Sequence, residues 1–272
     1  DGCNNFCTYC IIPYARGRVR SRKPESVIKE IEKIVKQGIQ EVVITGIHIA
    51  SYGKDFTDGT KLIDLLEKIN KIENLKRIRL GSLEPNIITQ DFVERLGKVD
   101  KICDHFHLSL QSGCNETLKR MNRKYTTQEF EKATDLLRKK FPNVALTTDI
   151  IVGFPGETEE EFNITYEFLK KIKFSKMHVF KYSPRKGTIA AKMKEQIDAR
   201  IKEQRSNKLI ELSNKNEIEF LEKYIGKELE VLFESKTHDN YIRRAHNKLY
   251  KCKSTRRKSG KHYKNRKNTK AR

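Results

Sequence analysis

Residues 144–158 read VALTTDIIVGFPGET, a strand-like run that continues through a glycine-containing loop to the first residue of a helix. The run at 144–152 is rich in β-branched and apolar side chains, which is typical of a strand buried on both faces in a parallel sheet. Thr158 and Glu161 have the spacing of a capping box, so a helix is expected directly after the loop. The segment therefore predicts one strand–loop–helix unit of an α/β fold.

The same alternation recurs on both sides of this segment. Four further strand-like runs are EVVIT (41–45), RIRL (77–80), HFHLSL (105–110) and KMHVF (176–180). Expected helix signals are a start at Pro24, caps at Thr60 and Thr89, a capping box from Thr126 to Glu129, and a stop at Gly38. Repeated units of this kind predict a parallel sheet, open or closed into a barrel. Right-handed crossovers bring the carboxyl ends of its strands to one rim, where functional residues are expected.

After the last of these strands the sequence predicts three different segments: a long helix, a short β-rich segment and a basic tail. Residues 198–223 predict a long, solvated helix packed through one stripe of Ile201, Leu209, Leu212, Ile218 and Leu221. Residues 228–234 (ELEVLFE) alternate like the first strand of a β-rich module, and Tyr241 with Ile242 forms its last strand-like fragment. Residues 243–272 contain fourteen Lys and Arg and no Asp or Glu, which predicts an extended, flexible tail. The tail either attracts nucleic acid or is a solubilising or non-native terminus.

Composition restricts the class of protein. The chain has 272 residues, with 57 Lys and Arg against 36 Asp and Glu, and a formal net charge of +21. Hydrophobic residues make up 36% of it, which suffices for one large or two small packed domains. No apolar run has membrane-spanning length and no signal-peptide pattern is present, so we expect a cytoplasmic protein without a membrane partner.

Cys3, Cys7 and Cys10 lie close together at the start of the chain. A structural zinc site normally needs four ligands, and no nearby Cys or His supplies a fourth. An iron–sulfur cluster bound by three cysteines keeps one iron free for an outside ligand, which favours catalysis over scaffolding. The remaining cysteines are too scattered to form a second site.

The Cys-x3-Cys-x2-Cys loop followed by βα units resembles the radical S-adenosylmethionine (SAM) superfamily. Further motifs narrow the resemblance to its methylthiotransferases: GRVRSR (17–22), TGIHIASYG (45–53), HLSLQSG (107–113), LKRMNRKYT (118–126) and DIIVGFPGETEEEF (149–162). The resemblance implies a (β/α)6-type barrel, a 4Fe-4S cluster on Cys3, Cys7 and Cys10, and SAM bound at the open iron. It also implies a reducing electron donor, because an electron from the cluster cleaves SAM in that superfamily.

Within the family, TGIHIASYG, HLSLQSGC and FKYSPRKGT look most like the branch that methylthiolates C2 of N6-threonylcarbamoyladenosine at tRNA position 37. The alternatives are another target, either isopentenyladenosine in tRNA or an aspartate of a ribosomal protein, and a non-catalytic tRNA-binding remnant. The implied partner is the anticodon loop of tRNA. The oligomeric state stays open.

Departures from the family pattern suggest an incomplete enzyme. The family's amino-terminal domain with its second 4Fe-4S cluster is absent, and the first barrel strand is expected just before Asp1, so we interpret the chain as a fragment with little complete transfer activity. YIGKELEVLFE resembles the start of the RNA-binding TRAM module, and we attribute the break beyond Ile242 to a frameshift. The expected division is a radical SAM core at 1–196, a connecting helix at 197–223, a truncated TRAM-like segment at 224–242 and a basic, disordered tail at 243–272.

The rim loops supply the candidate contacts. The resemblance implies cofactor contacts from Thr45, Gly46, Ser82, Glu84, Gln111, Ser112, Asp149 and Gly153; for the first four, an ordinary turn or a solvated loop is the alternative. Candidate RNA contacts are Arg16, Arg18, Arg185 and Lys186. For Arg16 and Arg18 the alternatives are steering of the SAM carboxylate and an ordinary solvated turn. No catalytic residue beyond the three cysteines is assigned, and His48, His105 and His107 are expected to be satisfied by local hydrogen bonds.

Overall fold

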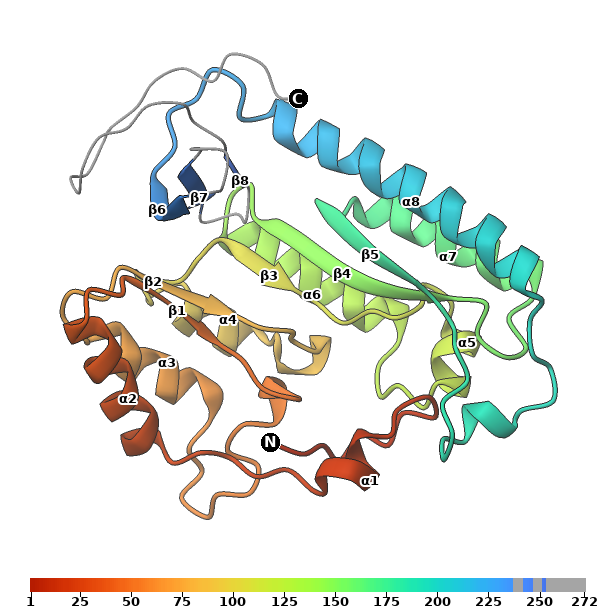
Figure 1. Ribbon diagram of the computed structural model, residues 1–272, viewed down its shortest axis with the longest axis horizontal. Coiled ribbons are helices and arrows are strands. Elements are labelled where there is room, and N and C mark those ends of the chain that lie inside the picture. The colour runs from red at the N-terminus through yellow and green to blue at the C-terminus, as the bar shows by residue number, and fades with distance from the viewer. Residues whose placement is uncertain (237–241, 247–250, 253–272) are drawn as a thin grey trace.

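The computed structural model describes residues 1–236, 242–246 and 251–252. Its centre is a set of parallel strands: β1 (Glu41–Ile44), β2 (Arg77–Leu80), β3 (His105–His107), β4 (Ala145–Val152) and β5 (Lys176–Lys181). β1 pairs with β2, and β4 pairs with both β3 and β5. Isolated parallel bridges from Ile78 to Ile102 and from Leu83 to Leu108 join the two groups. The strands thus follow one another in chain order around a curved sheet (Figure 1).

Helices cover the outer face of this sheet (Figure 1). The described helices are α1 (Ile12–Arg16), α2 (Pro24–Lys36), α3 (Leu62–Asn70), α4 (Gln90–Leu96), α5 (Asn115–Arg120), α6 (Thr127–Lys140), α7 (Glu159–Ile172) and α8 (Ala199–Glu222). Of these, α1 does not cover the sheet and lies apart from it, near the N-terminus (Figure 1). Short 3₁₀ turns are η1 (Ile49–Ser51), η2 (Pro85–Ile87) and η3 (Ala190–Lys192). The main core lies between sheet and helices, where Leu66, Phe106 and Phe130 are completely buried. Burial of large apolar side chains on this side leaves the inner face of the sheet for polar residues.

The α/β prediction with a parallel sheet is confirmed, and all five predicted strand runs contain a strand. Thr89, Thr126 and Thr158 cap α4, α6 and α7, the last two in capping boxes, as predicted. The prediction of a cap at Thr60 is wrong by one residue. Asp64 reaches back to accept a hydrogen bond from the backbone N–H of Lys61 at 2.7 Å, and this contact fixes the start of α3 at Leu62. In the described part of the chain, β1 and β5 lie at opposite edges and do not pair with each other.

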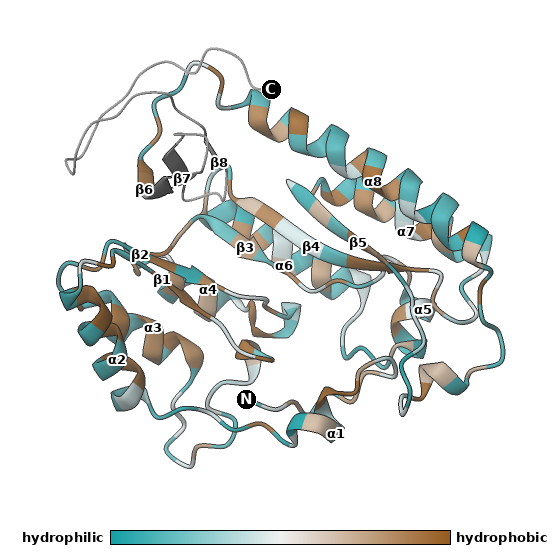
Figure 2. Cartoon of the chain, viewed as in Figure 1, coloured by the Kyte–Doolittle hydropathy of each residue, from teal (hydrophilic) through white to brown (hydrophobic). Residues whose placement is uncertain are grey.

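The long helix expected at 198–223 is α8, which packs along β5. Ser213 of α8 accepts a hydrogen bond from the backbone N–H of Met177 at 2.9 Å. Much of α8 is hydrophilic (Figure 2), and the helix buries one face. The predicted stripe is only partly right: Leu209 and Leu212 are buried, but Ile201 and Ile218 are exposed, because the buried face continues through Ser213 to Phe220. Among the described residues, no helix combines the length and the apolar composition needed to cross a bilayer.

A small antiparallel sheet follows α8. Its strands are β6 (Val231–Lys236), β7 (Ile242–His246) and β8 (Lys251–Cys252), paired in that order. The expectation of an unstructured tail from residue 243 therefore does not hold for β7 and β8, because backbone pairing with β6 and with each other organises them despite their charge. Tyr241 and residues 253–272 lie outside the described residues.

Candidate active site

The cysteine loop precedes α1 and is folded back on itself. Cys3 and Cys7 are buried and Cys10 is partly buried, and all three thiols are free of disulfides. The backbone N–H of Cys10 donates to the carbonyl of Cys7 at 2.9 Å, and that of Asn5 donates to Cys3 Sγ at 3.4 Å. Burial raises the pKa of the Cys3 and Cys10 thiols. A cluster bound here would have to displace the protons of these thiols.

The close approach of two chain segments makes a glycine necessary beside the first cysteine. The backbone N–H of Cys3 donates to the carbonyl of Gly17 at 3.1 Å. Gly2 has φ +71°, and a Cβ added to it would lie 1.9 Å from the carbonyl oxygen of Arg18. Only glycine fits such a position, so Gly2 keeps the two segments packed together.

The segment after α5 holds the rest of the loop. The side-chain amide of Asn122 donates to the carbonyl of Phe6 at 2.8 Å, and the Thr8 backbone N–H donates to the carbonyl of Met121 at 3.1 Å. Thr8 also accepts a bond from the backbone of Ala190 in η3 at 2.9 Å. Phe6 has φ 50°, a left-handed conformation that these contacts sustain. Segments far apart in sequence therefore fix the shape of the cysteine loop.

A buried ionic network lies directly behind the loop. Arg123 donates to Cys7 Sγ at 3.4 Å and to the carbonyl of Ser109 at 3.0 Å, and its guanidinium lies 2.9 Å from Glu84 Oε1. Glu84 also accepts a hydrogen bond from Asn5 at 2.8 Å, and His48 Nε2 lies 2.9 Å from its other oxygen. The side chains of Arg123 and Glu84 are only 6% and 5% exposed. Both carboxylate oxygens of Glu84 are thus engaged inside the protein.

The charge state of Glu84 follows from its partners. Burial by itself would raise its pKa, but the hydrogen bond with His48 and the positive charge of Arg123 together lower the pKa below its usual value. Glu84 was predicted to contact the cofactor. The structure places it beneath the cysteine loop, bonded to Asn5 of that loop. Its direct contact with SAM stays a prediction.

Other predicted cofactor contacts lie on the inner face or at the rim. Asp149 Oδ2 lies 3.2 Å from Nε2 of His107, whose other ring nitrogen lies 3.0 Å from Thr147 Oγ1. Gln111 has φ 71°, unusual for a residue with a side chain, and its backbone pairs with that of Asp149 and Ile151. The predicted HFHLSL run is thus longer than the strand: β3 ends at His107, and beyond it isolated bridges at Leu108 and Gln111 continue the pairing. Asp149 and Gln111 are therefore neighbours, as the prediction of a common rim requires.

Ser112 differs from its neighbours on the rim. It is completely buried, and its hydroxyl lies 3.2 Å from that of Thr165 in α7. Its Oγ also accepts a hydrogen bond from the backbone N–H of Cys114 at 3.2 Å. Ser112 therefore faces the helix layer. Ser82, after β2, is exposed.

The GFPGET loop is held by α8. Glu157 accepts a hydrogen bond from the backbone N–H of Gly153 at 2.7 Å, and Arg205 of α8 lies 2.7 Å from the same carboxylate oxygen. Arg205 also donates to the Glu157 carbonyl at 3.0 Å. Burial raises the pKa of Glu157, and the nearby Arg205 opposes this effect. Gly153, the predicted contact, is thus positioned by two buried side chains that sequence reasoning did not single out.

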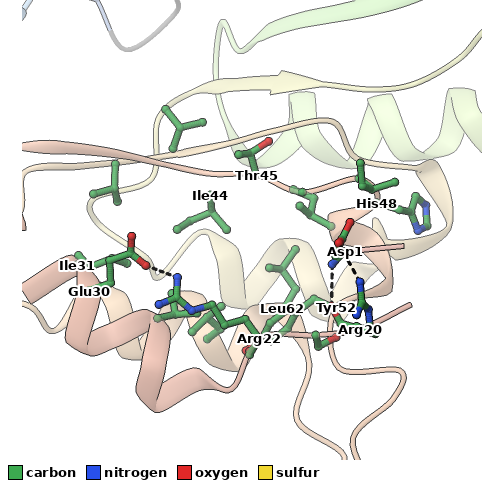
Figure 3. A pocket seen from close by; sticks show the side chains of 18 of the residues that line it. Asp1, Arg20, Arg22, Glu30, Ile31, Ile44, Thr45, His48, Tyr52 and Leu62 are labelled. Atoms are coloured by element: carbon green, nitrogen blue, oxygen red, sulfur yellow. Dashed lines mark hydrogen bonds and ion pairs between the residues drawn. The ribbon is translucent and has the colours of Figure 1, made fainter. Parts of the chain in front are cut away.

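A cavity of about 520 Å³ runs beside β1 (Figure 3). Thr45 and Gly46, at the carboxyl end of β1, line it together with Arg20, Arg22 and Tyr52. Arg22 forms an ion pair with Glu30 across this cavity (Figure 3). Thr45 and Gly46 are exposed, and their contact with SAM stays a prediction.

The predicted basic contacts flank the cysteine loop. Arg16 is 58% exposed and lies 3.8 Å from Asp1, and the guanidinium of Arg18 lies over the ring of Phe6 at 4.6 Å. Arg185 and Lys186 are exposed on the loop after β5. The positive charge of Arg185 acts on Cys10, which places this loop near the cysteines. Two basic segments distant in sequence therefore border one site.

The cysteine loop suits an iron–sulfur cluster better than a single ion. Within the described ranges, no group of three or more His, Cys, Asp or Glu side chains is arranged to hold one metal ion. In a cluster, each thiolate binds a different iron, so the ligands do not converge on one point. Three free thiols on one loop, with a buried arginine beside one of them, match the charge and the donor set of a cluster.

Comparison with known proteins agrees with this geometry. Residues 1–169 match the sequence profile of the radical SAM superfamily. The chain belongs to this superfamily. Two solved radical SAM enzymes share its fold: the methyltransferase TsrM from Kitasatospora setae and the coproporphyrinogen III oxidase HemN from Escherichia coli. TsrM superposes with a TM-score of 0.58 at 20% identity over 70% of this chain and 37% of TsrM. HemN superposes with a TM-score of 0.56 at 16% identity, over 79% of this chain and 50% of HemN.

The predicted resemblance to tRNA methylthiotransferases is also confirmed. The radical SAM chain is 49% identical over 232 residues to the threonylcarbamoyladenosine tRNA methylthiotransferase MtaB of Bacillus subtilis. The aligned region covers 85% of this chain and 51% of MtaB. The chain is 45% identical over 233 residues to the tRNA-2-methylthio-N(6)-dimethylallyladenosine synthase of Thermoanaerobacter sp. (strain X514), which covers 86% of this chain and 50% of that protein. The chain spans about half the length of the curated relatives it matches.

Proposed function

We propose that this chain is the SAM-cleaving core of a tRNA methylthiotransferase that acts on C2 of N6-threonylcarbamoyladenosine at position 37. The observation that carries the proposal is the cysteine loop, whose three free thiols are held together beside a rim of exposed polar groups. The choice of modified base is supported by the 49% identity to the Bacillus subtilis enzyme of that name.

Each group at the site has a distinct task in this proposal. Cys3, Cys7 and Cys10 hold a 4Fe-4S cluster, which when bound supplies the electron that cleaves SAM. Thr45 and Gly46 contact SAM at the exposed end of β1. Gln111, Asp149 and Gly153 orient it, and Ser82 completes the rim. Ser112 supports the rim from behind through its hydrogen bonds to Thr165 and Cys114. The surrounding barrel wall excludes water from the reaction.

The substrate reaches the site from the face that carries the cysteine loop. Arg16, Arg18, Arg185 and Lys186 border that face, and we propose that they contact phosphates of the tRNA anticodon loop. A reducing electron donor supplies the electron. The proposed division of the chain is the core at 1–196, the connecting helix at 197–223, a TRAM-like segment from 224, and the basic tail.

The first test is anaerobic cluster reconstitution of the chain, followed by an assay for 5′-deoxyadenosine formed from SAM with a chemical reductant. We expect about four irons per chain, as a 4Fe-4S cluster requires, and SAM cleavage. Both are lost in a Cys3→Ala, Cys7→Ala, Cys10→Ala triple variant. The matched control, Cys103→Ala with Cys114→Ala, removes two buried thiols and keeps both properties. Iron retained by the triple variant, or no cleavage by the unmutated chain, refutes the proposal.

A second candidate substrate is N6-dimethylallyladenosine, since a synthase of its 2-methylthio derivative is 45% identical to this chain. Nucleoside analysis of tRNA from a strain lacking the gene separates the two. Loss of the methylthio group from threonylcarbamoyladenosine supports our choice, whereas its loss from the dimethylallyl nucleoside assigns the second substrate.

A further inference from the structure

Arg123 is the buried cation nearest to the cysteine loop. Its guanidinium donates to Cys7 Sγ at 3.4 Å, lies 2.9 Å from Glu84 Oε1, and stacks over the ring of Tyr125 at 4.8 Å. Its Nε donates to the Tyr125 hydroxyl at 2.9 Å, so the arginine is fixed on several sides. With a side chain only 6% exposed, its charge is weakly screened by water.

A charge at this position acts on the electron affinity of a cluster. One-electron reduction adds one negative charge to the cluster, and the electron comes from an external reductant. A buried positive charge and a hydrogen bond to a cysteine sulfur both stabilise the reduced form relative to the oxidised form. The buried carboxylate of Glu84 has the opposite effect, because it places a negative charge behind the same loop.

We infer that Arg123 raises the reduction potential of the cluster bound by Cys3, Cys7 and Cys10, and that Glu84 limits this rise. Arg123 is therefore a positioning and tuning residue rather than a catalytic one, and the Glu84–Arg123 pair sets how easily the electron for SAM cleavage is accepted. This inference rests on the cluster of the proposed function. It gives Arg123, the second of the two arginines in the LKRMNRKYT motif, a task that neither RNA nor SAM binding requires.

The test is a redox titration of the reconstituted 272-residue chain without SAM, with dithionite as reductant and the reduced cluster followed by electron paramagnetic resonance. At a fixed potential, Arg123→Gln is expected to lower the ratio of reduced to oxidised cluster about tenfold, equal to about 59 mV for a one-electron couple. Glu84→Gln is expected to raise the ratio. The double variant returns towards the unmutated value, because both charges are removed together. Arg123→Lys keeps the charge, so its ratio of reduced to oxidised cluster is expected to lie between those of Arg123→Gln and the unmutated chain.

The control is Arg79→Gln, since the Arg79 side chain is also buried, at 7% exposed, and is paired with the carboxylate of Glu41 at 2.9 Å, but it belongs to β2. It leaves the ratio unchanged. Shifts of Arg123→Gln and Glu84→Gln in the same direction, or no shift in either, overturn the inference. So does loss of the cluster from Arg123→Gln, Arg123→Lys and Glu84→Gln alike, because the contacts are then only structural. If the unmutated chain takes up no cluster, the proposed function fails and the inference falls with it.

Discussion

Glu84 and His105 are both buried titratable residues, but the first is ionised and the second is neutral, and their neighbours explain the difference. Glu84 is kept ionised by His48 and Arg123, which outweigh the effect of burial. His105 has no such partner. Its burial, with the positive charge of Arg79, lowers its pKa to about 3. Its Nε2 lies 3.1 Å from Thr147 Oγ1, and its Nδ1 has no hydrogen-bond partner among the described residues. His105 is therefore neutral in the folded protein at neutral pH.

This neutral histidine makes stability depend on pH. Histidine in an unfolded chain has a pKa of about 6.5. Between that pH and about 3 the unfolded state binds a proton that folded His105 does not, so its contribution to stability is lost as the pH falls through this window. The expected loss is at most about 1.4 kcal/mol per pH unit. In His105→Gln this part of the dependence disappears, which denaturant unfolding at pH 7, 6 and 5 measures. Equal pH slopes for both proteins would contradict the assignment.

At the scale of elements, α8 acts as a brace along one edge of the sheet. Lys176 of β5 pairs with Glu217 of α8, and Ser213 of α8 bonds to the backbone of Met177. Nearly two turns from the start of α8, Arg205 holds Glu157 and thereby the backbone of Gly153. A helix outside the repeating βα units thus positions a loop of the proposed SAM site.

The substitution Arg205→Gln tests two roles of α8: stabilising the fold and positioning the Gly153 loop of the proposed SAM site. Removing one partner of a buried pair leaves an uncompensated charge, so the free energy of unfolding is expected to fall by about 3 to 5 kcal/mol. Replacing both partners, Arg205→Met with Glu157→Leu, regains much of that loss because no buried charge remains. SAM affinity is expected to fall in both variants. In Arg205→Gln, Glu157 loses the partner that holds it, and in the double replacement Gly153 loses its hydrogen-bond acceptor.

Chemical unfolding and a SAM-binding titration measure the two effects separately. The control is Lys181→Gln, which removes an exposed ion pair with Glu203 of the same helix and is expected to cost less than about 1 kcal/mol. Full recovery of SAM affinity in the double replacement would show that the pair contributes stability alone.

Most helices and strands could be predicted from the sequence. β2 coincides with the run RIRL because its flanks are polar, and α6 and α7 start where their capping boxes lie. The three cysteines were identified because their spacing is local. Arg123 and Arg205 were missed as individual residues. Each lies in a segment rich in Lys and Arg, and only the packing of distant elements decides which cation is buried.

At the scale of the whole molecule, the described basic residues near the cysteines form a small part of a net charge of +21. Arg16 ends α1 and Arg18 follows it, while Arg185 and Lys186 follow β5, yet both segments border the cysteine loop (Figure 1). Net charge alone draws a protein to RNA without orienting it. Oriented binding of a tRNA requires that these four side chains matter more than other exposed cations.

The salt dependence of tRNA binding distinguishes oriented docking through these four side chains from attraction by net charge alone. Each phosphate contact adds about 0.7 to 0.9 to the slope of log binding constant against log salt concentration. Changing Arg16, Arg18, Arg185 and Lys186 to Gln is therefore expected to reduce this slope for tRNA by up to about 3, and to weaken binding at low salt. The control changes the same number of exposed charges elsewhere, at Lys29, Lys33, Lys36 and Lys71 on and after α2 and α3. The basic tail is intact in all three proteins, so it contributes equally to each. If both quadruple variants lose the same slope, RNA is attracted by net charge alone, and the face around the cysteine loop does not dock the anticodon loop.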